Sequence, residues 1–318
     1  MRPLTVGALG DLEWAKALGK KSTESDILLA SFREGDVLCS LVIPIRYPEK
    51  PQCLAYAVQS ADALLLVVSA LTKEVGESIL AADASGVGQG LIVVRGAMQA
   101  EQLAPLLKGT ALAAWPTLTD DRVPTVRAKL AEFEAEARRG PVRVPVDHHF
   151  DVKGVGPVVL GFVKQGEPRK HDTYQIYPSG KTCQVRSIQV HDEDVDQAQI
   201  GDHVGLALKG CTTQDLDRGF VLAPEGTMEG RAADARVRLR VHVSKFFKAG
   251  VKTEGIYHLA IGMQFVPMRI TSGQASAGQD ASMEAQLQKP LAFEKGQRGV
   301  LFGLDHSPRV VGSAVVEG

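Results

Sequence analysis

The chain has 318 residues, of which 44% are hydrophobic and 23% are charged, and its formal net charge is −1. These values are typical of a globular protein with two or three domains, and they exclude a protein that is basic over its whole surface. No apolar run approaches the roughly 18 residues that a membrane-spanning helix needs. The N-terminus begins a strand pattern without a signal-peptide core, so we expect a cytoplasmic protein, and we expect a monomer.

Residues 1–140 alternate between strand and helix patterns. Apolar runs predict strands at 4–7, 27–31, 37–42, 63–69, 91–95 and 111–115. Apolar residues at helical spacing predict helices around 54–61, 75–82 and 126–137. Mostly apolar strands joined by crossover helices indicate a doubly wound α/β domain.

Residues 141–229 and 230–318 each contain a set of short strand patterns. The first set begins with a hairpin over 147–163, where Gly154 and Gly156 supply the freedom that a tight corner requires. Further strands are predicted at 173–177, 182–190 and 203–208, and in the second set at 236–243, 257–262, 263–271, 281–287, 299–304 and 309–316. Short strands separated by turns at this spacing are typical of antiparallel β-barrels, which close their own edges.

Glycines and valines recur in a long ordered pattern through the second region. They form the runs Phe150-x-Val152-Lys153-Gly154-x-Gly156-x-Val158-Val159-x-Gly161-x-Val163-x-x-Gly166, Val185-Arg186-Ser187-Ile188, Gly201-x-x-Val204-Gly205-x-x-Leu208-Lys209-Gly210 and Asp217-Arg218-Gly219-x-Val221-Leu222-Ala223. This pattern resembles the second domain of translation elongation factor Tu. The ending from Leu287 to Val316, with Lys289-Pro290 and Val310-Val311-Gly312, resembles the third domain of the same family.

The resemblance implies an elongation factor Tu-like architecture of three domains, combining α/β and all-β classes. A degenerate P-loop GTPase-like doubly wound domain would occupy 1–140, a barrel like domain 2 would occupy 141–229, and a barrel like domain 3 would occupy 230–318. The family also contains the selenocysteine-specific elongation factors, but we expect no full factor of that type because a long C-terminal extension is missing. The resemblance further implies that the barrels hold the acceptor end of a tRNA or touch the ribosome.

The phosphate-binding signature of this superfamily does not survive in the sequence. A phosphate loop needs G-x-x-x-x-G-K-[ST], since glycines let backbone N–H groups surround the phosphates while lysine and a hydroxyl neutralise them and hold Mg²⁺. Here Gly7 stands in the first place, but Leu12, Glu13 and Trp14 replace the glycine, the lysine and the hydroxyl. A carboxylate beside a polyphosphate costs several kcal/mol at an effective dielectric near 20, by an order-of-magnitude estimate.

Two further signatures are missing as well. The family's D-x-x-G-H would fall near 43–47, and its N-K-x-D would follow the strand that ends at Val94, where Arg95-Gly96-Ala97-Met98 stands. The stretch Gly19-Lys20-Lys21-Ser22-Thr23 follows a helix pattern, so we interpret it as a solvated helix end. These losses predict a pseudo-GTPase without a nucleotide cofactor. Misalignment of the three signatures, or a factor that keeps GTP through an altered loop, are the alternatives.

Positive charge is concentrated in residues 230–318, which contain 12 Lys and Arg residues but only 7 Asp and Glu residues. Arg236, Arg238 and Arg240 have period two, so one strand face presents three guanidinium groups. We predict that this face binds RNA phosphates; the alternative is a face that charge merely makes soluble. The complete set of predicted RNA-binding residues is Arg236, Arg238, Arg240, Lys245, Lys248, Asp147, His148, Phe150 and Arg186.

The sequence contains no pattern that predicts catalysis or a metal site. His148 and His149 are neighbours, so on a strand they point to opposite faces and cannot both ligate one ion. Cys39, Cys53, Cys183 and Cys211 are widely scattered, so we expect small buried hydrophobes and no disulfide. Two functions remain: a non-hydrolysing translation-factor relative that binds tRNA or ribosomal components, or a scaffold for protein interactions.

Overall fold

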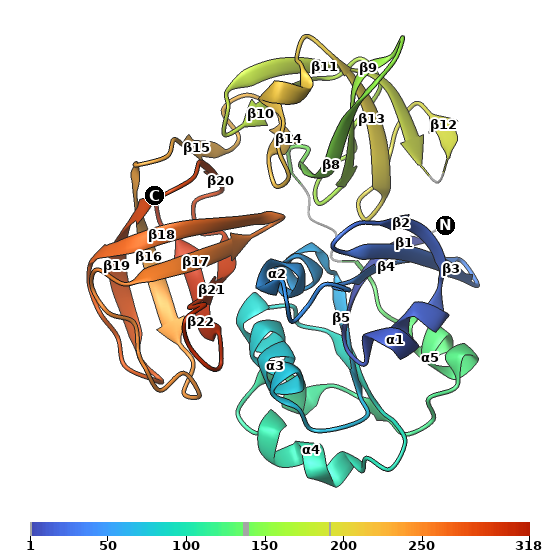
Figure 1. Cartoon of the computed structure of the whole chain (residues 1–318). Coiled ribbons are helices and arrows are strands. Elements are labelled where there is room, and N and C mark those ends of the chain that lie inside the picture. Colours follow the sequence, from blue (N-terminus) through green and yellow to red (C-terminus); the bar gives the residue numbers. More distant parts are fainter. Residues whose placement is uncertain (1, 136–139, 191) are drawn as a thin grey trace.

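The computed structural model describes residues 2–135, 140–190 and 192–318. The described chain forms an α/β domain and two antiparallel β-barrels, which Figure 1 shows as three separate lobes. This arrangement confirms the predicted fold class. None of the helices in these ranges combines the length and the apolar character that a membrane span requires.

The first domain is built on a seven-stranded sheet in the order β2-β3-β4-β1-β5-β6-β7. β1 is parallel to β4 and β5, and β6 and β7 continue the parallel order, whereas β2, β3 and β4 form antiparallel pairs. The strands are β1 (Arg2–Gly10), β2 (Lys20–Glu24), β3 (Leu28–Glu34), β4 (Val37–Ile43), β5 (Ala63–Val68), β6 (Gly90–Val94) and β7 (Thr117–Leu118).

Helices cover both faces of this sheet. Leu64 and Leu66 of β5 pack in one core cluster with α2 (Pro51–Ser60), α3 (Lys73–Ser85) and α4 (Ala100–Leu107). Leu65 and Val67 pack in another with α1 (Leu12–Ala15), η1 (Lys16–Leu18) and α5 (Val123–Leu130). Because side chains alternate along a strand, burial of both faces requires the continuous apolar run that the sequence shows.

Two predicted elements of the first domain are wrong. The strand predicted at 111–115 is a 3-10 helix, η2 (Ala111–Ala114), and the buried Trp115 that follows it packs tightly over Gly90. The stretch 20–23, interpreted as a helix end, lies in the edge strand β2. Both segments are too short for their hydrophobic pattern to distinguish a strand from a helical turn. Their contacts with neighbouring segments of the fold determine which structure forms.

The predicted helix at 126–137 is shorter than its apolar spacing indicates. α5 ends at Leu130, so Phe133 lies beyond it, and Ala137 falls outside the described residues. Pro124 occupies the first turn, as predicted, because proline lacks an amide hydrogen that this turn would leave unpaired.

The second domain is a barrel in the order β10-β14-β8-β9-β13-β11, closed by pairing of β10 with β11, and β12 adds to β11. Its strands are β8 (Val144–Val152), β9 (Gly156–Phe162), β10 (Thr173–Tyr177), β11 (Lys181–Val190), β12 (Glu193–Val195), β13 (His203–Lys209) and β14 (Val221–Ala223). The predicted hairpin is β8–β9, and both Gly154 and Gly156 have positive φ, at 82° and 98°. A register shift between Val146 and His148 leaves Asp147 in a bulge of β8.

The third domain is a closed barrel in the order β16-β19-β18-β17-β21-β22. Its strands are β16 (Arg236–Val243), β17 (Ile256–Ile261), β18 (Gln264–Ser272), β19 (Asp280–Leu287), β21 (Arg298–Phe302) and β22 (Val310–Val316). A short pair, β15 (Glu229–Arg231) with β20 (Leu291–Phe293), lies between the barrels, so the proposed boundary at 229/230 runs through β15.

The first domain shares apolar core with both barrels. One buried cluster joins α2 and α3 to Phe162 of the second domain and to Ala260, Met263 and Phe302 of the third. In Figure 1 these two helices lie on the side of the first domain that faces the third. Separating the domains would expose this apolar surface to water, at a free-energy cost of about 25 cal/mol per Å².

Gly7 provides a test of how the first domain packs. It lies inside β1 facing α2, where an added Cβ would approach the Ala57 carbonyl oxygen to 2.4 Å and the Leu64 side chain to 2.8 Å. We predict that Gly7→Ala lowers the free energy of unfolding by about 1–3 kcal/mol because the strand and helix must separate. Urea denaturation would measure this change.

The matched control is Gly76→Ala, since Gly76 lies in α3 with open space around it. That substitution should leave stability unchanged or raise it by about 0.5–1 kcal/mol. A Gly7→Ala protein that is as stable as the wild type would contradict the packing described for β1 and α2.

Candidate functional site

Doubly wound domains bind their ligands at the carboxyl edge of the sheet, beyond the ends of the parallel strands. In this protein β1 continues to Gly10 and α1 begins at Leu12, so Asp11 alone connects them. The Asp11 amide donates to the Val67 carbonyl at 2.8 Å, and its side chain accepts from the Trp14 amide at 3.1 Å. A connection of one residue cannot wrap a row of backbone N–H groups around a phosphate.

Gly7 was predicted to open the phosphate loop, and this placement is wrong. It lies within β1, three residues before the strand ends, where it allows close contact with α2. Leu12 packs against the apolar cluster, and the Glu13 side chain is 84% exposed and pairs with Lys16 at 2.6 Å. Of the stretch that the signature would place in a phosphate loop, only Asp11 lies outside strand β1 and helix α1, and its residue types differ from the signature as well.

Arg95 occupies the carboxyl edge that the loop would have bordered. Its Nη1 lies 2.7 Å from the Asp11 carboxylate and its Nε lies 2.7 Å from the Asp121 carboxylate. The guanidinium also lies 5.2 Å from the centre of the Trp14 ring. We name Asp11, Trp14, Arg95 and Asp121 the Arg95 cluster. Sequence reasoning identified the missing N-K-x-D at Arg95 but missed its two carboxylate partners.

The segment at 43–47, where the family's D-x-x-G-H was expected, contacts the third domain. The Tyr47 hydroxyl donates to Glu77 of α3 at 2.8 Å. Glu77 also accepts from the Arg309 guanidinium, at 2.6 Å from Nη2, and from the Arg309 amide at 2.7 Å. Burial would raise the pKa of Glu77, but the hydrogen bonds from Arg309 and Tyr47 outweigh it and lower that pKa. These three residues form the Glu77 clamp.

Arg218 joins the first domain to the second. It contacts Asp26 at 2.7 Å, Asp147 at 3.1 Å and the Asp147 carbonyl oxygen at 2.8 Å, and it lies over the Tyr56 ring at 5.1 Å. Asp147 is 1% exposed, and the His148 ring nitrogen lies 3.3 Å from its carboxylate. Asp147 was predicted to help bind RNA, but the structure buries it in this interface. In the described residues, no three His, Cys, Asp or Glu side chains gather as a metal site.

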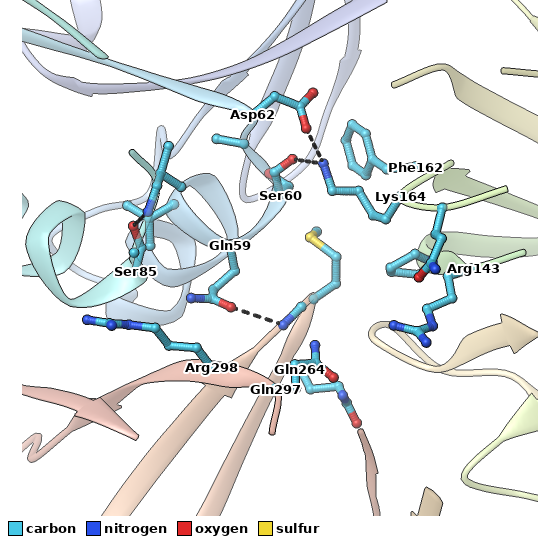
Figure 2. Close-up of a pocket in the computed structure, with 18 of the residues that line it drawn as sticks. Gln59, Ser60, Asp62, Ser85, Arg143, Phe162, Lys164, Gln264, Gln297 and Arg298 are labelled. Atoms are coloured by element: carbon cyan, nitrogen blue, oxygen red, sulfur yellow. Dashed lines mark hydrogen bonds and ion pairs between the residues drawn. The ribbon is translucent and has the colours of Figure 1, made fainter. Parts of the chain in front are cut away.

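A cavity of about 730 Å³ lies where the three domains meet (Figure 2). On its upper side in that view, Lys164 of the second domain donates to the Ser60 carbonyl at 2.7 Å and to Asp62 at 3.1 Å. Arg298 of the third domain donates to the Ala84 carbonyl at 2.9 Å, and Arg143 pairs with Glu294. The cations that line this cavity therefore hold the domains to one another.

The three predicted arginines of β16 do share one solvent-exposed face. Arg236, Arg238 and Arg240 are exposed and alternate with buried residues. The face also carries negative charge, because Glu284 of β19 is opposite Arg238 and Glu317 lies 3.8 Å from Arg240.

The remaining predicted RNA-binding residues do not gather around that face. Lys245 donates to the Lys108 carbonyl of the first domain at 3.0 Å, while Lys248 is exposed. Phe150 is 44% exposed on the β8–β9 hairpin, and nearby Arg186 donates to the Val155 carbonyl at 2.6 Å. Figure 1 shows this hairpin and β16 in different lobes, so the two predicted surfaces are not continuous.

The α/β domain followed by two antiparallel β-barrels has the three-domain architecture of translation elongation factors. Residues 156–223 match the family model of elongation factor Tu domain 2. Among solved structures, translation elongation factor SelB from Methanococcus maripaludis in complex with the GTP analogue GPPNHP is similar with a TM-score of 0.84, at 21% identity over 100% of this chain and 79% of that chain. A bacterial selenocysteine-specific elongation factor is similar with a TM-score of 0.78, at 20% identity over 99% of this chain and 58% of that chain.

Two sequence relatives come from Methanocaldococcus jannaschii. An uncharacterized protein is 34% identical over 315 residues, which is 98% of this chain and 99% of that protein. The selenocysteine-specific elongation factor is 35% identical over 129 residues, which is 41% of this chain and 27% of the factor. The chain belongs to the translational GTPase superfamily, with the elongation factor Tu and selenocysteine-specific elongation factors.

The Glu77 clamp yields a stability prediction. The Glu77 side chain is 8% exposed, so removing its cation leaves a buried carboxylate without its ion-pair partner. We predict that Arg309→Ala lowers the free energy of unfolding by about 2–3 kcal/mol at pH 7. Urea denaturation would measure this, and Arg269→Ala is the control because its pair with Glu254, at 3.5 Å, has an arginine 49% exposed and should matter by less than about 0.5 kcal/mol.

The Glu77 clamp should contribute less to the free energy of unfolding at low pH. Since the folded pKa of Glu77 is lowered, its contribution is fully present above the unfolded value, about 4.3, and is lost as pH falls through the folded value. The stability difference between wild type and Arg309→Ala should therefore shrink below about pH 4. A difference that stays constant with pH would show that the clamp is not electrostatic.

Proposed function

We propose that this protein is a translation-factor relative that neither binds nor hydrolyses GTP and that binds tRNA or a ribosomal component through its barrels. The observation that carries the first part is the Arg95 cluster. A polyphosphate at this edge would meet the carboxylates of Asp11 and Asp121, both already paired with Arg95 at 2.7 Å. Separating these groups to admit a phosphate would cost their attraction and add repulsion between like charges.

Support for the barrels as the binding part comes from charge and family. The excess of cations lies in the third domain, and the exposed arginines of β16 point to solvent in one row. Two solved structures that are similar to the whole chain are elongation factors. The observation that favours a protein scaffold instead is the presence of Glu284 and Glu317 beside the arginines, since both weaken attraction for a phosphate backbone.

We infer that the domains keep one arrangement. A ligand shifts a conformational equilibrium only by its differential affinity for the two states, so a first domain without a nucleotide has no such source of free energy. The Glu77 clamp, the Arg218 contacts and the shared apolar core bind the first domain to both barrels.

The first functional prediction concerns nucleotide. Purified protein should retain no GTP or GDP, calorimetry should detect no binding at micromolar concentrations, and GTP hydrolysis should stay at background. Neither Glu13→Lys nor Arg95→Ala should create binding, because the loop after β1 still has a single residue. A GTP-binding elongation factor measured in parallel is the positive control. Micromolar or tighter GTP binding by the wild type would overturn this part of the proposal.

The second functional prediction concerns RNA. Replacing Arg236, Arg238 and Arg240 together by alanine should lower affinity for tRNA at least tenfold at low salt and flatten its salt dependence. Because these side chains are exposed, the far-ultraviolet spectrum and the urea midpoint should not change. The charge-matched control replaces the exposed Lys20, Lys21 and Arg33 of the first domain by alanine and should retain affinity. Equal RNA binding by the two triple variants, or none by the parent, would favour the scaffold.

A further inference from the structure

Two of the four cysteines, distant in sequence, meet at one end of the second-domain barrel. Cys183 lies in β11, and Cys211 follows the end of β13. These strands are antiparallel, with Gln184 opposite Lys209, so one step further Cys183 comes opposite Gly210. An added Cβ on Gly210 would lie 3.9 Å from the Cys183 Cα, which places the two segments in contact.

Gly210 also determines where the next side chain points. Strict strand alternation would send the side chains of Cys211 and Cys183 to opposite faces of the barrel wall. Gly210 instead has φ of +86°, a left-handed conformation that ends the alternation. As a result Cys211 packs against the same apolar cluster that contains Cys183.

The two thiols differ in access and in acidity. Cys183 is 1% exposed, whereas Cys211 is half-buried and borders solvent. A hydrogen bond from the Cys183 thiol lowers the pKa of Cys211, with a smaller contribution from Lys181, and outweighs burial and the Asp215 carboxylate, which raise it. The same thiol contact and burial raise the pKa of Cys183. Cys39 and Cys53 are buried in the first domain, and burial raises the pKa of both thiols.

We propose that Cys211 and Cys183 form a reversible intramolecular disulfide by exchange with a small-molecule disulfide of the oxidised glutathione type. The Cys211 thiolate attacks one sulfur of that reagent, forms a mixed disulfide and expels one thiolate. Cys183 then loses its proton and attacks the Cys211 sulfur, which releases the second thiol. Two protein thiols and one disulfide thereby become one protein disulfide and two small thiols.

The position of this bond has a structural consequence. Cys211 begins the segment that runs through η3 (Thr213–Asp215) to Arg218, whose contacts with Asp26 and Asp147 join the first two domains. Oxidation would fasten the start of this segment to β11. It would therefore stabilise the barrel by limiting the conformations open to the unfolded chain.

The test uses the 318-residue chain and oxidised glutathione. After incubation, the protein is unfolded in denaturant, free thiols are alkylated and peptides are identified by mass spectrometry. We expect a linked peptide that joins Cys183 to Cys211 and is lighter than the two reduced peptides together by two hydrogens. Cys39 and Cys53 should both be found alkylated. Cys211 should lose its reactivity toward the alkylating agent at least tenfold faster than Cys39 or Cys53.

Variants separate the two roles. Cys183→Ala, which keeps a small apolar side chain in the core, should accumulate a glutathione adduct on Cys211, because the second step is blocked. Cys211→Ser should leave Cys183 unmodified, and Cys53→Ala should form the bond like the wild type. A stable glutathione adduct in the wild type without a cross-link, a bond to Cys39 or Cys53, or full alkylation of both thiols after treatment would each overturn the proposal.

Discussion

The ion pairs of Arg95 with Asp11 and Asp121 occupy the carboxyl edge of the sheet in the first domain. They connect the ends of β1 and β6 with the loop that follows β7, across the edge where a doubly wound domain would receive its ligand. One guanidinium paired with two carboxylates leaves a net charge of −1 at this edge, which disfavours an anionic ligand. The aromatic face of Trp14 adds a further contact to the guanidinium. The edge is therefore held together by the chain's own side chains.

Other charged residues of the first domain contact the two barrels. The segment around Tyr47 joins α3 and Arg309 in a contact with the third domain, while Arg218 and Lys164 reach from the second. The charged members of these contacts are mostly buried, so each is screened from salt far less than a surface pair. Together with the apolar cluster of α2 and α3, they make the first domain a support that sets the relative positions of the two barrels.

The surfaces left for partners are consequently those that the domain contacts do not use. The face of β16 is exposed along its length, and the tip of the β8–β9 hairpin exposes Phe150 and Val155. The cavity between the domains is bordered by cations that are committed to Asp62, Glu294 and the Ala84 carbonyl, which suits a structural role. A macromolecular partner that touched both barrels would have to bridge two separate lobes.

Local sequence determined the fold class of this protein. Alternation identified the β16 arginine face, because a strand has a period of two, and Gly154 and Gly156 marked the hairpin because their positive φ disfavours other residues. The missing phosphate signature was also visible, since it depends on residues close together in the chain. Only the tertiary structure decided which distant residues meet: Arg95 with Asp121, Asp147 with Arg218, and Cys183 with Cys211. These partners are 26 or more residues apart, and no periodicity of a strand or helix extends that far; the packing of whole elements brings them together.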